Sequence, residues 1–176
     1  MRGTHRRIER AHGKALHLGL EPEPLGYFET SAETISFFEQ LRAEHPNDAR
    51  LDAHLGVNYD TCHLAVEYEE AADALGAFRT AGIRISKLHL SAALKVTPDA
   101  DTRARLKSFE EDVYLHQVIE RQPDGTLTRH RDLDVALAAE TNADEWRIHF
   151  HIPLHSPNGE WFASTRDHID GVLDVM

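Results

Sequence analysis

The sequence predicts an α/β protein built as part of a (βα)8 TIM barrel, and three observations favour this fold. Apolar stretches with strand patterning alternate with amphipathic helical stretches, which is typical of a parallel sheet. Side chains that can bind a metal follow the C-terminal ends of several predicted strands, and this end of a barrel carries the active site. The chain has 176 residues, whereas a complete barrel needs about 250.

We therefore expect residues 1–176 to form a single partial barrel domain that lacks the N-terminal strands and the C-terminal end of the barrel. A doubly wound open sheet is the alternative. It fits the sequence less well because it would not direct side chains from four consecutive strands at one point. An incomplete barrel of this kind is expected to be inactive on its own.

The composition disfavours several classes of protein. The formal net charge of -11 argues against nucleic-acid binding, which needs a basic surface to displace counterions. Hydrophobic residues make up 41% of the chain, and no apolar run approaches the roughly 20 residues that a membrane-spanning helix needs. Cys62 is the one cysteine, so no disulfide forms within the chain. We expect a cytoplasmic protein that does not insert into membranes.

The first predicted strand places a carboxylate at its C-terminal end. Residues 1–13 have the pattern of a helix that ends at Gly13, and a strand over 14–20 follows. The run Glu21-Pro22-Glu23-Pro24 ends this strand, because proline cannot continue a ladder of hydrogen bonds. Glu21 is thus a candidate for a site at the strand end. Alternatively, Glu21 and Glu23 are solvated loop charges.

Two helices flank the second predicted strand, which covers residues 53–58. The first helix begins at Thr30, which forms a capping box with Glu33. Its apolar stripe consists of Ile35, Phe38 and Leu41. The second helix covers residues 69–81 and ends at Gly82. It is expected to bury Ala71, Ala74, Leu75 and Phe78.

Asp60 and His63 follow the second strand, where the chain is expected to run into a loop. A carboxylate and an imidazole three residues apart can converge on one divalent cation. Cys62 lies between them, but the alternation of side chains at a strand end turns its sulfur away. The alternative is that Asp60 caps a turn and that His63 only packs.

Residues 83–91 form the clearest strand pattern in the chain. Because side chains alternate between the two faces of a strand, Lys87 and His89 share the face of Ile83 and Ile85. A single histidine on such a face is more often a core residue than a ligand. The position of His89 at the C-terminal end of the strand favours a role in the site.

The second half of the chain begins with a polar helix over 101–111, which is expected to bury Leu106 and Phe109. A hairpin follows, in which residues 114–121 pair with residues 126–131 across the turn Pro123-Asp124-Gly125. His116 lies on the first arm of this hairpin.

A short helix over 133–140 leads to a strand over 146–154, which we place in the same parallel series. On this strand Arg147, His149 and His151 share one face. Two histidines two residues apart indicate the polar wall of a site, and a stacked pair of unconnected histidines is the alternative. A final helix starts at residue 164 and carries Ile169, Val172 and Leu173.

Three motifs, in this order, resemble those of the xylose-isomerase-like TIM barrels: Leu20-Glu21-Pro22, Tyr59-Asp60-Thr61-Cys62-His63 and Lys87-Leu88-His89-Leu90-Ser91. That superfamily includes sugar isomerases, epimerases and endonuclease IV-like enzymes. Within it the chain is most similar to the EboE-type metabolite traffic proteins. The likeness covers nearly the whole chain and extends to His54-Leu55-Gly56-Val57, Tyr114-Leu115-His116-Gln117 and His149-Phe150-His151-Ile152-Pro153-Leu154.

The resemblance implies that Glu21, Asp60 and His89 are metal ligands at the ends of successive strands. It makes His63 either a further ligand or a substrate contact, and His116 an accessory ligand. His151 occupies a final-strand position where the superfamily often has glutamate. The candidate catalytic residues are Glu21, His63 and Lys87. Oxygen and nitrogen donors without a thiolate favour Mn²⁺, Zn²⁺ or Fe²⁺.

The sequence thus predicts a divalent-metal-dependent protein of the sugar isomerase or epimerase type that acts on a small polyol-like or sugar-like metabolite. A bound cation would polarise a carbonyl and hydroxyl pair. Glu21 is the first candidate for the base, although one residue does not easily serve as both tight ligand and base. The EboE resemblance implies processing or trafficking of a secondary-metabolite precursor, with partners from the same pathway.

Two alternatives remain open. The first is a non-catalytic carrier of a metabolite or a metal on the same scaffold, because a fold does not determine a function. The second is an endonuclease IV-like phosphodiesterase, which the acidic net charge disfavours.

Overall fold

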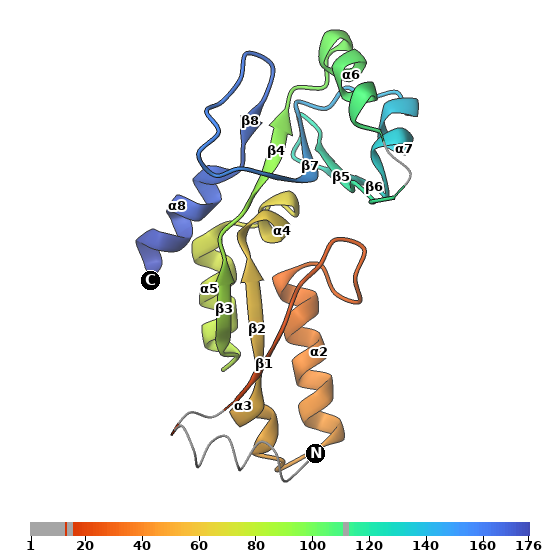
Figure 1. Cartoon of the computed structure of the whole chain (residues 1–176). Helices are drawn as coiled ribbons and strands as arrows, with labels where there is room; N and C mark the ends of the chain where they lie inside the picture. The colour runs from red at the N-terminus through yellow and green to blue at the C-terminus, as the bar shows by residue number, and fades with distance from the viewer. Residues whose placement is uncertain (1–12, 14–15, 111–112) are drawn as a thin grey trace.

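The computed structural model describes residue 13 and residues 16–110 and 113–176. These residues form two sheets (Figure 1). The first sheet is parallel and has the strand order β1-β2-β3. Its strands are β1 (Leu18–Leu20), β2 (Leu55–Asp60) and β3 (Ile85–His89).

The second sheet is antiparallel and has the strand order β6-β5-β7-β4-β8. Its strands are β4 (Ala92–Val96), β5 (Val118–Arg121), β6 (Leu127–His130), β7 (Glu145–Ile152) and β8 (Ala163–Ser164). In Figure 1 this sheet lies above the parallel one, and the chain crosses from one to the other between β3 and β4.

The antiparallel sheet shows that the predicted partial TIM barrel is wrong. Two consecutive parallel strands of one sheet must be joined by a crossover of a dozen or more residues, which usually contains a helix. β3 ends at His89 and β4 already begins at Ala92, so no crossover fits between them. The strand predicted over 146–154 is β7, which pairs antiparallel with both β4 and β5. The fold is a mixed α/β domain with two sheets.

The helices predicted beside the parallel sheet are confirmed. α2 (Ser31–Glu44) begins with the expected capping box between Thr30 and Glu33. α5 (Ala71–Thr80) buries the four expected side chains. Gly82 follows with φ +66°, a left-handed conformation that glycine adopts without a steric penalty. With Val57 and Tyr59 of β2, the buried side chains of both helices form the core of this part of the fold.

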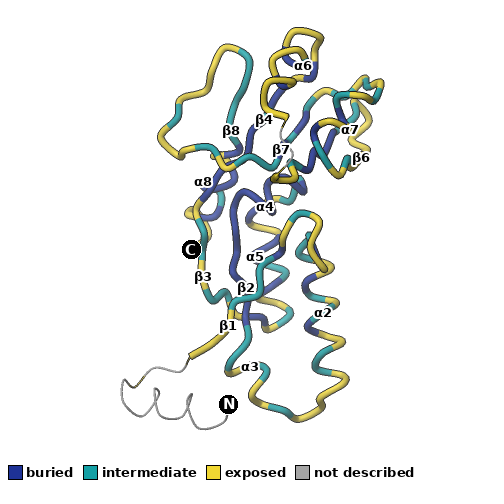
Figure 2. The backbone as a smooth tube through the Cα atoms, turned by 45° about the vertical axis from the view of Figure 1, so that its right-hand side comes forward, coloured by how far each residue is buried: buried dark blue, intermediate teal, exposed yellow. Residues whose placement is uncertain are grey.

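Two short helices differ from the sequence prediction. α3 (Arg50–His54) precedes β2. α4 (Thr61–Val66) follows β2 directly, where a loop was expected, and all six of its residues are buried. Figure 2 shows β2 and α4 as a buried segment in the middle of the molecule. α4 contacts β4, β7 and the C-terminal helix α8 (Arg166–Val175), so it joins the two sheets.

The antiparallel sheet has its own core, in which Trp146 and Ile148 of β7 pack against Leu94, Val118 and Leu106. α6 (Ala100–Leu106), a 3-10 turn (Lys107–Phe109) and α7 (Leu133–Ala138) cover it. The predicted hairpin of β5 and β6 is confirmed, with Gly125 at φ +86° in its turn. No helix in the described ranges is long and apolar enough to cross a bilayer.

Two side chains that were expected to be buried are exposed. Phe109 is 46% exposed, because the helix tightens into the 3-10 turn and moves this residue off the buried stripe. Leu173 is 56% exposed on the outer side of α8. The helix predicted over 1–13, the start of the strand over 14–20 and the last residue of the helix over 101–111 lie outside the described residues, except for Gly13 itself.

A buried hydrogen bond connects β2 to α8. The hydroxyl of Tyr59 lies 2.9 Å from Nε2 of His168 and donates to it, and the two rings are stacked. His168 is 8% exposed, and burial followed by the charge of Arg147 lowers its pKa to about 4. The ring is therefore neutral at neutral pH and accepts from Tyr59.

We expect His168 to make the free energy of unfolding depend on pH. An unfolded histidine titrates near 6.5, so its contribution is complete above pH 6.5 and is lost as the pH falls toward 4. The loss reaches about 3 kcal/mol. Urea unfolding of the metal-free protein between pH 7 and pH 4 measures it. His149 and Glu67 also have shifted pKa values and add to the pH dependence. The contribution of His168 is therefore the difference in the free energy of unfolding between the wild type and His168→Gln. Glutamine keeps an acceptor for Tyr59. Equal slopes for the two proteins would contradict this prediction.

Candidate metal centre

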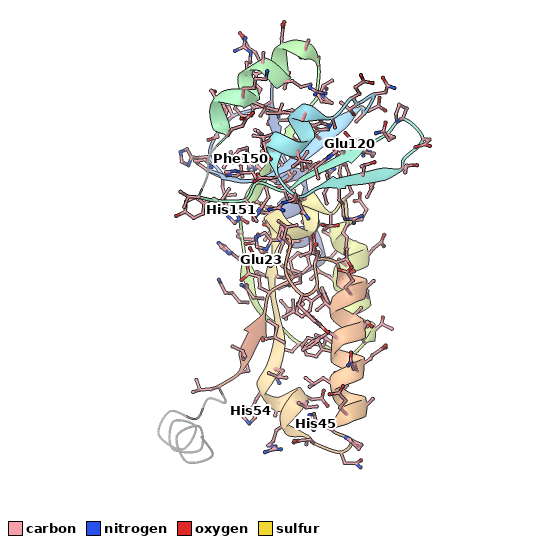
Figure 3. All side chains as sticks on the ribbon, turned by 90° about the vertical axis from the view of Figure 1, so that its right-hand side faces the viewer. Glu23, His45, His54, Glu120, Phe150 and His151 are labelled. Atoms are coloured by element: carbon pink, nitrogen blue, oxygen red, sulfur yellow. The ribbon has the colours of Figure 1, made fainter. Side chains whose placement is uncertain are left out.

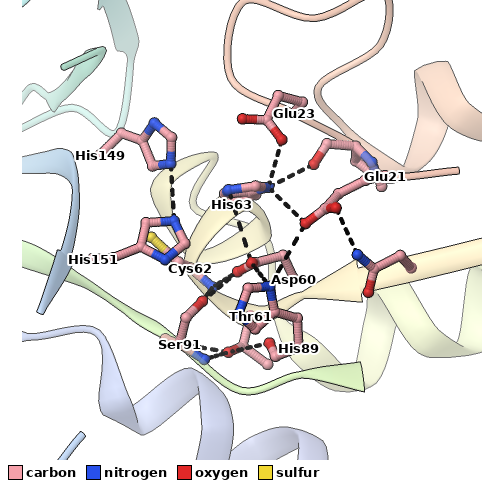
Figure 4. A network of polar contacts seen from close by, with 12 residues as sticks. Glu21, Glu23, Asp60, Thr61, Cys62, His63, His89, Ser91, His149 and His151 are labelled. Atoms are coloured by element: carbon pink, nitrogen blue, oxygen red, sulfur yellow. Dashed lines mark hydrogen bonds and ion pairs between the residues drawn. The ribbon is translucent and has the colours of Figure 1, made fainter. Parts of the chain in front are cut away.

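The three parallel strands end at a common group of polar side chains (Figure 4). Glu21 follows the last residue of β1, Asp60 is the last residue of β2, and His89 is the last residue of β3. Asp60 and His89 are register partners in the sheet. His63 lies one turn into α4. The structure thus brings together the four side chains that the sequence placed at the C-terminal ends of strands.

Asp60 is the centre of this group and is fully buried. Its Oδ1 accepts hydrogen bonds from the backbone N–H of Cys62, at 2.8 Å, and from the hydroxyl of Ser91. Its Oδ2 is buried and accepts no hydrogen bond from the described residues, although Nδ1 of His89 lies 2.7 Å away. A buried carboxylate oxygen without a hydrogen-bond donor is costly, and a bound cation would compensate for it.

Burial opposes ionisation of Asp60, but the charge of His63 and the hydrogen bonds from Ser91 and Cys62 hold its pKa below the usual value. Asp60 is therefore an anionic candidate ligand at neutral pH. It also caps α4, as the turn-capping alternative predicted, and its second oxygen stays available to a metal.

One ring nitrogen of His63 is hydrogen-bonded to the backbone. Its Nδ1 lies 2.9 Å from the carbonyl oxygen of Pro22 and donates a hydrogen bond to it. In the neutral form of the ring this bond places the proton on Nδ1 and leaves Nε2, 3.9 Å from Asp60 Oδ2, as the nitrogen that can bind a metal. Metal-binding histidines usually donate their other ring N–H to a carbonyl or carboxylate in this way.

The two glutamates after β1 differ in position. Glu21 Oε2 accepts a hydrogen bond from the side-chain amide of Asn58 at 2.6 Å, which leaves Oε1 3.9 Å from His89 Nδ1 and 3.7 Å from His63 Nδ1. Glu23 Oε2 is also 3.7 Å from His63 Nδ1, but the Glu23 side chain is 50% exposed. Burial, only partly offset by the charge of His63, raises the pKa of Glu23.

Two imidazoles from the antiparallel sheet complete the group. His149 and His151 of β7 face α4, and their Nε2 atoms are 3.2 Å apart. The ring of His63 packs edge-on against both. Burial lowers the pKa of His149 to about 3 and also lowers that of His151. Both rings are neutral at neutral pH, as metal ligands must be.

The donor atoms lie close enough together to converge on one cation after a small shift. Two donors that each lie roughly 2.1 Å from a metal are about 3.0 to 3.4 Å apart. The groups Glu21–Asp60–His63 and Asp60–His89–His151 each place one donor atom per residue within 4.8 Å of the others. A small inward movement of side chains would bring these atoms to bonding distance. The residues present therefore fit a divalent cation with oxygen and imidazole ligands.

Hydrogen bonds outside the group fix its geometry. The hydroxyl of Thr61 donates to the carbonyl oxygen of Ser91 at 2.6 Å and accepts from the backbone N–H of Ser91 at 2.8 Å. The Ser91 hydroxyl in turn holds Asp60. These bonds tie the start of α4 to the point where the chain leaves one sheet for the other (Figure 4).

The sequence prediction turned the sulfur of Cys62 away from Asp60 and His63 by strand alternation, but the structure removes the basis of that argument. Residues 61–66 are helical, so strand alternation does not apply to them. The sulfur lies within 4.8 Å of ring nitrogens of His149 and His151. Burial, followed by the charges of Asp60 and Glu23, raises the pKa of the thiol well above its usual value. The thiol is protonated at neutral pH and is not a ready ligand.

Two other predicted residues lie outside the groups of donor atoms. Lys87 is exposed on β3 and has no hydrogen bond or ion pair with the group in the described part of the chain. The ring of His116 stacks on Phe150, with centroids 4.1 Å apart. The assignment of Lys87 as a catalytic residue and that of His116 as an accessory ligand stay predictions. His116 lines the wall of a cavity beside the group.

A cavity of about 570 Å³ opens beside the group. Glu23, His149 and His151 line one end of it, and His116 and Phe150 line a wall. Figure 3 shows Glu23 below His151 and Phe150, where the two parts of the molecule meet. A small molecule in this cavity would contact Glu23, His149 and His151 at the edge of the group.

From the sequence, neither His149 nor Glu23 was named as a metal ligand or as a catalytic residue. The spacing of His149 and His151 on one face of a strand indicated a polar wall, and that signal was correct. Glu23 was visible as the second carboxylate after β1, but its separation from Glu21 depends on the bend of the following loop. That bend is a tertiary property.

No protein family, curated protein or solved structure matches this chain. The resemblance to the EboE-type proteins therefore stays a prediction. The roles given to individual residues below depend on the geometry.

Proposed function

We propose that the protein binds one divalent cation of the Mn²⁺, Zn²⁺ or Fe²⁺ type and catalyses an isomerase-type or epimerase-type proton transfer on a small hydroxy-carbonyl compound. Asp60 Oδ2 carries this proposal. It is a buried oxygen that accepts no hydrogen bond from the residues that the structure describes, and imidazole nitrogens of His89 and His63 lie 2.7 Å and 3.9 Å from it. Glu21 and His151 supply further donor atoms within reach.

A cation held by Glu21, Asp60 and the neighbouring imidazoles would polarise a substrate carbonyl, which would lower the pKa of the C–H next to it. The two glutamates have different roles, one as metal ligand and one as general base. Glu21, which Asn58 orients toward the group, serves as ligand. Glu23 lines the cavity, and its raised pKa suits a general base, so Glu23 takes the proton. This division removes the conflict of using one residue as both ligand and base.

The proposal is tested by proton exchange with solvent. The protein is loaded with Mn²⁺ or Zn²⁺ and incubated in D₂O with a panel of aldoses, ketoses and simpler hydroxy ketones, and NMR follows deuterium at the carbon next to the carbonyl. We expect exchange that stops when a chelator removes the metal. Stoichiometric metal without exchange on any compound would contradict the catalytic proposal and favour the carrier alternative.

A further inference from the structure

The cavity beside the candidate ligands is polar at one end, and apolar side chains make up much of its walls. His149, His151 and Glu23 form the polar end. Pro24, Leu25, Val113, Leu115 and Phe150 contribute apolar surface to the rest, where Tyr114, His116 and Gln117 also lie. The apolar part of the walls is therefore a surface that a ligand can cover beside the candidate ligands.

Leu25 is held at the rim of this cavity by an unusual backbone conformation. Its φ is +62°, in the left-handed region that residues other than glycine rarely adopt. The turn is closed by a 2.7 Å hydrogen bond from Gly26 N–H to the carbonyl oxygen of Glu23. A Cβ at Gly26 would lie 2.8 Å from that oxygen, so glycine is required there. The turn thus places Glu23 and Leu25 on the same cavity, although the Leu25 side chain is 42% exposed.

A bare sugar would leave the apolar side chains of this cavity uncovered. Each of its hydroxyl groups needs a hydrogen-bond partner, and a site that buries a hydroxyl without one loses affinity. Apolar walls that are open to water gain affinity when an apolar group covers them. The polar end and the apolar walls therefore match two different parts of one ligand.

We propose that the substrate is a hydroxy-carbonyl compound that carries an aliphatic or aromatic substituent. Its oxygen atoms would face Asp60 and the histidines, and its substituent would cover Leu25, Leu115 and Phe150. This inference rests on the proposed metal centre and narrows the substrate class that the centre takes. It separates the substrate from unsubstituted polyols and sugars.

Two hydroxamates test the inference. Both acetohydroxamate and benzohydroxamate bind divalent metals through the same two oxygens, and only the second carries an apolar ring. The full chain is loaded with Co²⁺, and visible absorption follows the titration of each compound. Affinities for free Co²⁺ correct for intrinsic differences. We expect the corrected affinity for benzohydroxamate to be higher by about tenfold or more, because its ring covers apolar wall.

Variants of the wall should reduce this preference selectively. Leu25→Gly removes a side chain and suits a left-handed residue, so the fold is not at risk. In Leu25→Gly and Leu115→Ala we expect the preference to fall to about threefold or less, with unchanged affinity for acetohydroxamate. Leu173→Ala is the matched control, because Leu173 is similarly exposed but lies on α8. It should keep the full preference.

The outcomes separate the two proposals. Equal corrected affinities in the wild type would overturn the apolar-substituent inference and leave the metal centre standing. Bound Co²⁺ whose spectrum responds to neither compound would also overturn it, because the cavity would then not lead to the cation. No uptake of Co²⁺ would overturn the metal centre itself, and this inference with it.

Discussion

Asp60→Asn is expected to weaken the binding of Mn²⁺, Zn²⁺ or Fe²⁺ by about 100-fold or more. Even residues that only orient a ligand typically contribute 10- to 100-fold, and Asp60 would be an anionic ligand itself. Asparagine keeps an acceptor for Cys62 N–H, so α4 retains its cap. The loss should therefore reflect the missing charge at Oδ2 and not unfolding. Metal content after dialysis, with circular dichroism as a check on the fold, measures it.

A matched control changes a carboxylate on the helix that precedes the same strand. Asp52 lies on α3, just before β2, and its side chain is 64% exposed. Asp52→Asn makes the same change of charge far from the candidate ligands and should leave metal content unchanged. If Asp60→Asn keeps stoichiometric metal, the group at the strand ends is not the metal centre.

Much of the candidate site was predictable because it depends on local patterns. Glu21, Asp60 and His89 were found by the rule that polar residues at the C-terminal ends of parallel strands converge. That rule needs only the ends of β1, β2 and β3 and their parallel pairing. The strand ends were predicted to within two residues and the pairing is parallel as expected, so these three residues converge even though the barrel was wrong.

The fold class was not predictable in the same way because it depends on contacts distant in the sequence. Residues 83–91 were predicted to form one strand, yet the chain changes sheet between His89 and Ala92. The Thr61 hydroxyl stabilises that change by bonding to Ser91, 30 positions along the chain. No periodicity within either segment indicates this contact. The pairing of β7 with β4 and β5 is equally nonlocal.

The antiparallel sheet nevertheless contributes to the site. His149 and His151 approach from β7, so the group is closed by a strand of the second sheet and not by a later strand of a barrel. Their face on the strand was predicted from alternation. Their partner sheet was not, because alternation determines which side a residue faces and not which strand lies beside it.

Glu23→Gln is expected to reduce metal-dependent deuterium exchange by about 100-fold to 10,000-fold, which is the usual contribution of a general base. Metal content should be unchanged, because Glu23 is half exposed at the cavity and Glu21 is the oriented ligand. In the wild type, exchange should decline as the pH falls through the raised pKa of Glu23, since only the carboxylate accepts a proton. NMR in D₂O and metal analysis of the same samples measure both effects.

Two further variants make the assignment specific. Glu39→Gln removes an exposed carboxylate on α2 and should change neither exchange nor metal content. Glu21→Gln should lose metal and exchange together, because a ligand acts on both. The pattern that would overturn the assignment is the reverse one, with Glu23→Gln losing metal and Glu21→Gln keeping it. Glu21 would then be the base, and the bend after β1 would present Glu23 to the cation instead.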